Sequence, residues 1–275
     1  NEYGPESNAF TGGYLPGEPG GDRDCSRRLQ MSSDISRPIV EHFTAQSRDI
    51  TPPAACDAVC LVHAPVSQDP EVTNRCWDIL SDQEQQRARR FTAKYDRSHF
   101  LQRRVFRRFC AAAALGAREP LSRIIFQETE KGRPYLAEVP ELRFSFSSCR
   151  SGFLGAWSKT HGIGVDIEDQ RGQIEPVTLA DRFFTRTEAR SIARTDHGMR
   201  LWTFLRLWTL KEAALKSIGE GLPYGLDAFE FELEPIPRVV AAPRDHGGET
   251  QFEAHIVDSI DNCAALIIRD LAAGL

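Results

Sequence analysis

The chain has 275 residues, of which 41% are hydrophobic, and a formal net charge of −5. A chain of this length and composition buries a sizeable core in one large or two small domains. The negative charge gives no bulk attraction to nucleic acid, and no apolar run approaches the roughly 20 residues of a membrane span. We therefore expect a soluble, cytoplasmic protein that binds neither nucleic acid nor membrane.

The cysteines form an odd and scattered set of seven, at positions 25, 56, 60, 76, 110, 149 and 263. Cys56 and Cys60 lie in or beside an apolar, strand-like run and have no second pair at zinc-ligand spacing. This pattern disfavours a zinc site and predicts buried, reduced thiols.

Residues 1–54 are rich in glycine, proline, serine and charged residues. Such a segment buries too little apolar surface to offset the entropy of ordering, so we expect a flexible linker or tail. The chain begins at Asn1, and its methionines are Met31 and Met199. Either Met31 is the natural start behind added sequence, or the chain is a piece of something longer.

The first half contains four predicted strands and two predicted helices. Ser81 and Glu84 form a capping-box signature that predicts a helix through Arg90. The segment 97–115 predicts a second helix with an apolar side and a basic side, and a basic side of this kind is usually just solvated. Strands are expected at 58–66, 124–126, 144–149 and 153–157. Gly132 and Pro134 indicate a tight turn within 131–136.

The second half opens with an acidic strand and continues with helices. From Ile163 to Glu168 apolar and acidic residues alternate, so Asp166 and Glu168 share one strand face. Helices are expected over 176–184, 187–195 and 201–218, and the last of these stops at Gly219. Closing strands are expected at 229–233, 252–257 and 263–268.

The candidate site joins the acidic strand to the last helix. Two carboxylates on one strand face repel each other unless a cation lies between them. Trp208, Glu212 and Lys216 fall at steps of four and share one helix side. If the two faces meet, three carboxylates converge, and that ligand set suits Mg²⁺. Taken singly, Glu212 and Lys216 are equally consistent with an ordinary solvated ion pair on a helix. Asp166 and Glu168 are likewise consistent with the solvent-exposed face of an edge strand.

Three stretches together are more specific than any one of them. These are Gly164-Val165-Asp166-Ile167-Glu168, Phe183-Phe184-Thr185-x-x-Glu188 and Trp208-Thr209-Leu210-Lys211-Glu212-Ala213-Ala214-Leu215-Lys216. In this order they resemble the signature of the 4′-phosphopantetheinyl transferases, the enzymes that load carrier proteins with the arm of coenzyme A, in their larger surfactin-type (Sfp-type) class. The resemblance implies an α+β fold with two similar α/β subdomains, residues 55–158 and 159–272, related by a pseudo-twofold axis with the active site in the cleft between them.

The resemblance also implies the reaction and its partners. A serine of an apo acyl or peptidyl carrier protein would accept the arm of coenzyme A, and 3′,5′-ADP would leave, in service of a polyketide, fatty-acid or nonribosomal peptide synthase. Asp166, Glu168 and Glu212 would hold Mg²⁺, Glu212 or a water that it orients would be the base, and Lys216 would protonate or stabilise the leaving phosphate. The enzyme would be a monomer of two similar halves, or a domain of a larger synthase.

Six residues match family positions that bind coenzyme A: Arg87, His99, Arg133, Ser147, Ser148 and Lys216. Two of them depart from the family pattern, since Ser148 stands where a histidine is usual and His99 where many members carry an arginine. Losing one donor to a phosphate weakens binding by about 1–3 kcal/mol. We expect Lys211 to be a phosphate or surface contact and Trp208 to belong to the core.

Two other functions remain open at this stage. One is a non-catalytic coenzyme A or nucleotide-binding protein on the same scaffold, which the altered segment around Ser148 favours. The other is a Mg²⁺-dependent pyrophosphate hydrolase, in which water replaces the serine.

Overall fold

The computed structural model describes residues 40–44, 59–116, 120–170, 174–258 and 262–271, with only the backbone given for the first of these segments. The expected linker, residues 1–54, lies outside the described residues except for strand β1 (Val40–Thr44). This strand pairs in parallel with β2 (Val59–Pro65). In the described part of the chain, no helix is long and apolar enough to cross a membrane.

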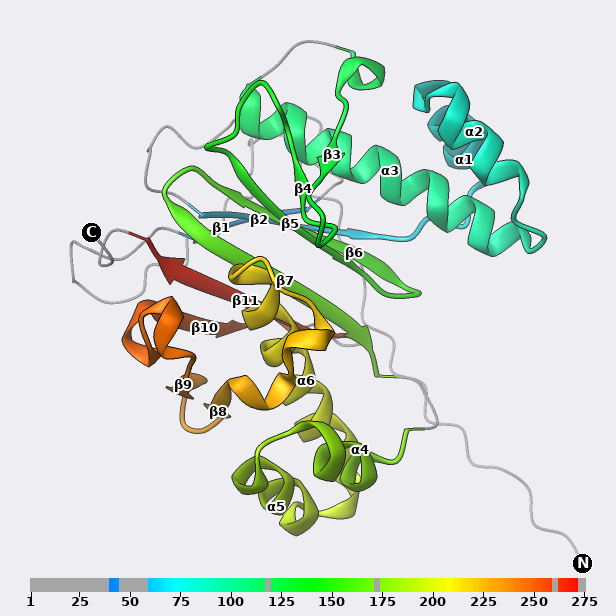
Figure 1. Ribbon diagram of the computed structural model, residues 1–275. Helices are drawn as coiled ribbons and strands as arrows, with labels where there is room; N and C mark the ends of the chain where they lie inside the picture. The colour runs from blue at the N-terminus through cyan, green and yellow to red at the C-terminus, as the bar shows by residue number, and fades with distance from the viewer. Residues whose placement is uncertain (1–39, 45–58, 117–119, 171–173, 259–261, 272–275) are drawn as a thin grey trace, which may run out of the picture.

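The first sheet has the strand order β1-β2-β6-β5. Strand β6 (Gly152–Ser158) is antiparallel to both β2 and β5 (Arg143–Ser148). The 22-residue helix α3 (Lys94–Leu115) lies across the outer face of this sheet, as Figure 1 shows. Phe106 from the helix stacks on Phe153 from the sheet, with ring centroids 5.6 Å apart. The apolar side predicted for this helix therefore faces the core.

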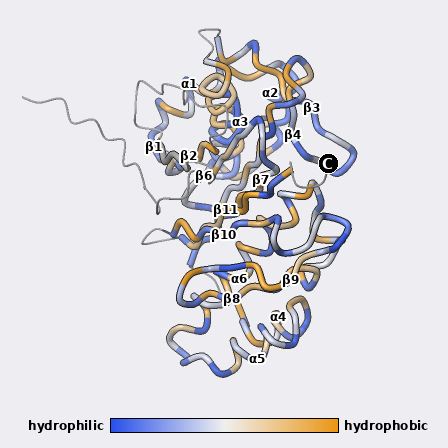
Figure 2. Tube along the Cα trace, turned by 90° about the vertical axis from the view of Figure 1, so that its left-hand side faces the viewer, coloured by the Kyte–Doolittle hydropathy of each residue, from blue (hydrophilic) through white to orange (hydrophobic). Residues whose placement is uncertain are grey.

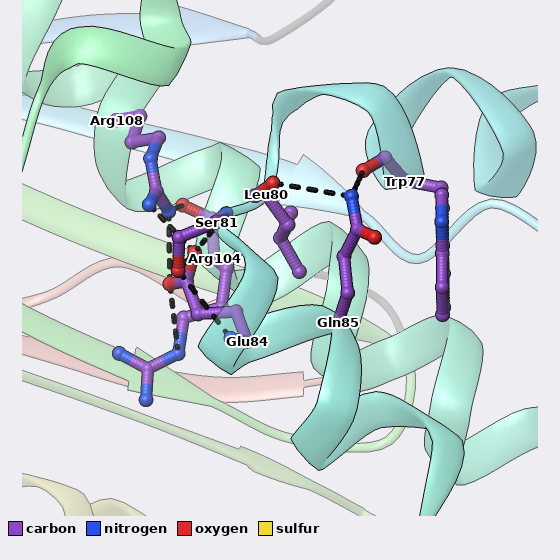
Figure 3. Close-up of polar contacts among 7 residues, drawn as sticks. All are labelled: Trp77, Leu80, Ser81, Glu84, Gln85, Arg104 and Arg108. Atoms are coloured by element: carbon purple, nitrogen blue, oxygen red, sulfur yellow. Dashed lines mark hydrogen bonds and ion pairs between the residues drawn. The ribbon is translucent and has the colours of Figure 1, made fainter.

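Two shorter helices, α1 (Pro70–Ile79) and α2 (Asp82–Arg89), pack beside α3. The capping box of α2 forms as the sequence predicts, between Ser81 and Glu84. The Glu84 carboxylate also pairs with Arg108 of α3 at 2.7 Å, which Figure 3 draws. The Glu84 carboxylate thus caps the start of α2 and also links α2 to α3.

The second sheet has the order β10-β11-β7 and is antiparallel. Its strands are β7 (His161–Asp169), β10 (Phe252–Ile256) and β11 (Asn262–Asp270). The 21-residue helix α6 (His197–Ser217) covers its outer face. Helices α4 (Pro176–Phe183) and α5 (Arg186–Arg194) follow β7 and pack against α6 at the lower end of the view in Figure 1.

The inner faces of the two sheets share one hydrophobic core. Ile163, Val165 and Ile167 of β7 are buried there with Leu61 of β2 and Leu154 of β6. In Figure 2 the hydrophobic colouring follows parts of the central strands, whereas the outer loops are mostly hydrophilic. The alternation predicted for β7 is confirmed, because its apolar residues point between the sheets and Asp166 and Glu168 point to the other side, toward α6.

A small hairpin and a second strand pair complete the described elements. Strands β3 (Gln127–Glu128) and β4 (Pro134–Tyr135) form the hairpin, whose turn contains Gly132 with a φ of 80°. Strands β8 (Glu230–Glu232) and β9 (Arg238–Ala241) form the pair. The expected turn at Gly132 is confirmed, but helix α1 and strand β9 were not anticipated.

The strand expected at 124–126 is wrong. A short 3₁₀ turn (Leu121–Arg123) precedes these residues, and pairing begins only at Gln127. Ile124 is buried, whereas Ile125 is 69% exposed. Three apolar residues in a row are too short a pattern to decide between a strand and an irregular segment that buries one side chain.

Helix α6 lies unusually close to β7 at Gly164. A Cβ atom built on this glycine would lie 1.8 Å from the carbonyl oxygen of Ala213 and 2.6 Å from the backbone nitrogen of Ser217. Both neighbours are backbone atoms of the helix, so neither can rotate away. The absence of a side chain at Gly164 therefore sets the distance between the acidic strand and the helix.

We predict that Gly164→Ala destabilises the protein by about 1–3 kcal/mol or more, as overpacking of a tight core does. Gly198→Ala in the first turn of the same helix is the matched control, because a Cβ atom there meets nothing within 4 Å. The free energy of unfolding, measured by urea titration, is the test. Equal stability of the two variants would contradict the close contact.

Candidate active site

The acidic strand β7 and helix α6 meet through charged side chains. The Lys216 Nζ atom lies 2.6 Å from Asp166 Oδ1 and 3.8 Å from Glu212 Oε2. Asp166 is almost fully buried, at 2% exposure, whereas the Lys216 side chain is 29% exposed, so the pair is shielded from solvent at its carboxylate end. The predicted meeting of Asp166, Glu212 and Lys216 therefore occurs in the structure.

A serine from the first sheet joins this cluster. The Ser147 hydroxyl donates a hydrogen bond of 2.7 Å to Asp166 Oδ1 and accepts one of 3.2 Å from Lys216 Nζ. Two residues earlier on β5, the hydroxyl of Ser145 accepts a hydrogen bond from the backbone N–H of Val165. The edge strands β5 and β7 are thus tied together beside the cluster.

The carboxylates of the cluster repel one another. Burial, then the charges of Asp166 and Glu212, raise the pKa of Glu168 to about 7. Burial and the charge of Asp166 likewise raise the pKa of Glu212, although Lys216 and a hydrogen bond from Trp208 oppose the shift. One ammonium therefore does not balance the negative charge of the three acids.

The three acids do not close around a single point. Within the described residues, no group of three or more histidine, cysteine, aspartate or glutamate side chains is placed so that it could hold a metal ion. However, the Asp166 Oδ2 atom is buried and, in this part of the chain, accepts no hydrogen bond. A buried carboxylate oxygen without a donor is costly and is suited to receive a cation.

A cavity of about 220 Å³ opens beside Glu212 and Lys216. Arg107 of α3 and the β3–β4 hairpin, with Lys131 and Arg133, supply further cations to its wall. Lys131 forms an ion pair with Glu220 across the cavity. One nitrogen of Arg133, Nη2, is buried and makes no hydrogen bond within the described residues, and burial lowers the pKa of this guanidinium. The cavity wall thus has the charge and the donors to bind an anion.

Three of the residues expected to bind coenzyme A lie away from this cavity. Arg87 lines a separate open hollow of about 570 Å³ on α2, together with Arg90 and Phe91. The His99 ring lies 2.9 Å from the carbonyl oxygen of Cys149 through Nε2, which is therefore the donor. Ser148 follows Ser147 on β5 and so points to the opposite strand face. The structure gathers Arg133, Ser147 and Lys216, but not Arg87, His99 and Ser148.

The expectation for Lys211 is wrong, because its side chain is fully buried. The ammonium lies 2.6 Å from Glu188 Oε2 and donates hydrogen bonds to the carbonyl oxygens of Leu226 and Phe229. The other Glu188 oxygen accepts the backbone N–H of Phe231 at 3.0 Å. One residue before Glu212, α6 is thus fixed to α5 and to the segment leading into β8.

Known proteins resemble this chain in the segment that contains the two site elements, β7 and α6. Residues 162–272, which contain α6 and all of β7 except its first residue, match the family model of the 4′-phosphopantetheinyl transferase superfamily. The 4′-phosphopantetheinyl transferase ffp of Bacillus subtilis is 30% identical over 66% of this chain and 79% of its own length. The chain belongs to the 4′-phosphopantetheinyl transferase superfamily.

Two other relatives also match most of the length of this transferase. The phosphopantetheinyl transferase of Thraustochytrium sp. is 29% identical over 81% of each chain. The 4′-phosphopantetheinyl transferase Sfp of Bacillus subtilis strain 168 is 29% identical over 66% of this chain and 79% of its own, which supports the Sfp-type class. The crystal structure of holo-[acyl-carrier-protein] synthase from Neisseria meningitidis aligns with 40% of this chain and 97% of that chain at 19% identity and a TM-score of 0.33, too low a likeness to carry an argument.

Sequence reasoning missed two features of the transferase's site. Arg107 lines the cavity, although the sequence shows it only as one of several arginines on a helix face. Trp208 donates a hydrogen bond to Glu212 besides packing on Phe184 and Phe204. The step of four from Trp208 to Glu212 was the available signal for the second; nothing in the sequence singled out Arg107.

We predict that Lys211→Met destabilises the transferase by about 3–5 kcal/mol, because it leaves the Glu188 carboxylate buried without its cation. The double variant Lys211→Met/Glu188→Gln should recover part of this loss, since glutamine is neutral and keeps an acceptor for the Phe231 N–H. Urea unfolding of both variants measures the difference. A single variant as stable as the wild type would rule out a structural role for the pair.

Proposed function

We propose that the protein is a holo-carrier-protein synthase, which transfers the 4′-phosphopantetheine arm of coenzyme A to a serine of an apo acyl or peptidyl carrier protein and releases 3′,5′-ADP. Its family membership supports this activity, as do relatives that are named 4′-phosphopantetheinyl transferases. The observation that carries the proposal is the meeting of Asp166, Glu212 and Lys216 beside a cavity walled by further cations.

In this reaction the serine oxygen bonds to the β-phosphorus of coenzyme A, and the bond from that phosphorus to the bridging oxygen breaks. Glu212 is the candidate base, directly or through a water, because it lines the cavity and its burial raises its pKa. Lys216, one turn further on α6, would stabilise or protonate the departing 3′,5′-ADP. Asp166 and Ser147 hold the Lys216 ammonium in place.

The acids of the cluster fit a magnesium ion by their chemistry. Asp166, Glu168 and Glu212 are oxygen donors, burial and the charges of Asp166 and Glu212 raise the pKa of Glu168, and one oxygen of Asp166 receives no hydrogen bond from the described residues. These three residues would hold Mg²⁺, which when bound would supply a Lewis acid for the diphosphate charge.

The finer organisation is also proposed. Each of the two halves, residues 55–158 and 159–272, has a sheet covered on its outer face by one long helix, α3 or α6, and the chain passes from one sheet to the other between β6 and β7. This supports two similar subdomains related by a pseudo-twofold axis, with the site where they meet. We propose a cytoplasmic monomer or a domain of a larger synthase, with Arg87 and His99 at outer parts of the coenzyme A site.

One assay separates the three candidate functions. The protein is incubated with Mg²⁺, coenzyme A and an apo carrier protein, and the masses of the products are measured by mass spectrometry. A mass gain of one phosphopantetheine on the carrier is the expected result. Free phosphopantetheine would indicate a hydrolase, and binding of coenzyme A without any product would indicate a non-catalytic protein.

We predict that Glu212→Gln lowers the rate of carrier loading by about 10²–10⁴-fold, the usual contribution of a general base. Asp166→Asn, which keeps the shape but not the charge, should also abolish most of the activity, while Lys216→Ala should lower turnover more than coenzyme A binding. The loading rate and the coenzyme A dissociation constant are measured side by side. Full activity of the Asp166 or Glu212 variant would remove the substituted residue from the mechanism.

We predict that Mg²⁺ raises the melting temperature of the wild-type protein in the absence of coenzyme A, because an ion bound only to the folded state stabilises it by mass action. Glu168→Gln should reduce this rise, since it removes one charged ligand. The melting temperature in Mg²⁺-free buffer with EDTA provides the baseline for both proteins. Identical responses of the two proteins to Mg²⁺ would exclude Glu168 as a ligand.

A further inference from the structure

Helix α3 presents a row of basic residues toward strand β5. His99, Arg103 and Arg107 follow one another at steps of four, so they lie on one side of the helix. The His99 ring meets the carbonyl oxygen of Cys149 just beyond the end of β5, and the Arg107 guanidinium lies over the Phe146 ring, 5.4 Å from its centre. The row therefore ends at the cavity that Lys216 lines.

Arg107 carries a buried charge that is poorly compensated. Its side chain is 19% exposed, and its ion pair is with Glu128 at 3.6 Å, a hairpin carboxylate that is itself 52% exposed. Within the described residues the Arg107 Nε atom is buried without a hydrogen-bond acceptor. Burial, then the charges of Arg104 and Arg103, lower the pKa of Arg107 to about 10. The guanidinium thus remains charged near neutral pH, and its Nε donor has no acceptor among the described residues, as is also the case for Arg103, Arg104 and Arg108.

The neighbouring arginines of α3 are compensated differently. Arg108 binds Glu84 through two nitrogens, at 3.1 and 2.7 Å, and Arg104 lies 3.7 Å from the same carboxylate. Figure 3 shows Arg108 directed at Glu84 next to the start of α2, whereas Arg104 faces this carboxylate through its Nε atom. Neither lines the cavity. Arg108 has a close structural partner and Arg104 lies near the same largely buried carboxylate, whereas the partner of Arg107 is exposed and Arg107 faces the cavity.

We infer that Arg107 binds the diphosphate of coenzyme A and that Glu128 holds its guanidinium until the donor arrives. This inference rests on the proposed function. Arg107 and Lys216 line the same cavity, and Lys216 is the residue assigned to the reacting phosphate. The planar guanidinium offers paired donors to a phosphate, and the exposed Glu128 is a pair partner worth little in water.

The test is coenzyme A binding measured by calorimetry with Mg²⁺ and without a carrier, so that no turnover occurs. Arg107→Met keeps an unbranched apolar side chain without the charge and should weaken binding by about tenfold or more, as expected when a charged hydrogen bond is lost. Arg104→Met is the matched control on the same helix, with a similar exposure of 20%, and should bind as the wild type does. Arg107→Lys should fall between them.

A second ligand identifies the phosphate that is bound. Dephospho-coenzyme A lacks the 3′-phosphate but keeps the diphosphate, so Arg107→Met should weaken its binding by the same factor. If the weakening disappears with this ligand, Arg107 contacts the 3′-phosphate and the inference is overturned.

The Glu128→Gln variant provides an independent test. Without the competing carboxylate, coenzyme A should bind more tightly than to the wild type, and a loss of affinity would contradict the role given to Glu128. If the wild type loads the carrier normally and the Arg107→Met variant binds coenzyme A as tightly as the wild type does, this inference alone is overturned. A wild type that binds coenzyme A but loads no carrier would instead overturn the proposed function.

Discussion

The close contact between helix α6 and Gly164 of strand β7 is the constraint on which the site depends. It brings backbone against backbone, so the next outward residue of the strand, Asp166, comes within ion-pair distance of Lys216. A larger residue in place of Gly164 would separate the two elements and with them the acids and the ammonium. The position of the charges is thus decided by an uncharged residue without a side chain.

Two groups of buried charge in the second half have opposite characters. Lys211 and Glu188 satisfy each other and several backbone groups, so their burial fixes the helix to its surroundings. Asp166, Glu168 and Glu212 repel one another, and one ammonium does not satisfy them. Because Lys211 directly precedes Glu212 on α6, the satisfied group holds the strained one in place.

The parts that sequence reasoning found are those with a strong local pattern. The alternation in β7, the capping box at Ser81 and the helix through Glu212 depend on neighbouring residues, and all three are confirmed. Spacing also indicated that Glu212 and Lys216 share a helix side. What it could not give was contact between distant segments: that Ser147 bonds to Asp166, that Lys211 is buried against Glu188, or that Arg107 reaches the cavity. Such pairs depend on how the two sheets and their helices are placed, which no local pattern records.

The buried cysteines have a consequence for the chemistry of the donor. As the sequence predicted, Cys76, Cys110, Cys149 and Cys263 are buried and form no disulfide, while Cys25 and Cys56 lie outside the described residues. Burial raises the pKa of each of the four, to about 11 for Cys76 and about 12 for Cys263. Thiolate is the form that attacks a disulfide, so these side chains are poor partners for exchange. In an enzyme whose co-substrate, coenzyme A, ends in a thiol, burial thereby keeps these four sulfur atoms from forming mixed disulfides with that molecule.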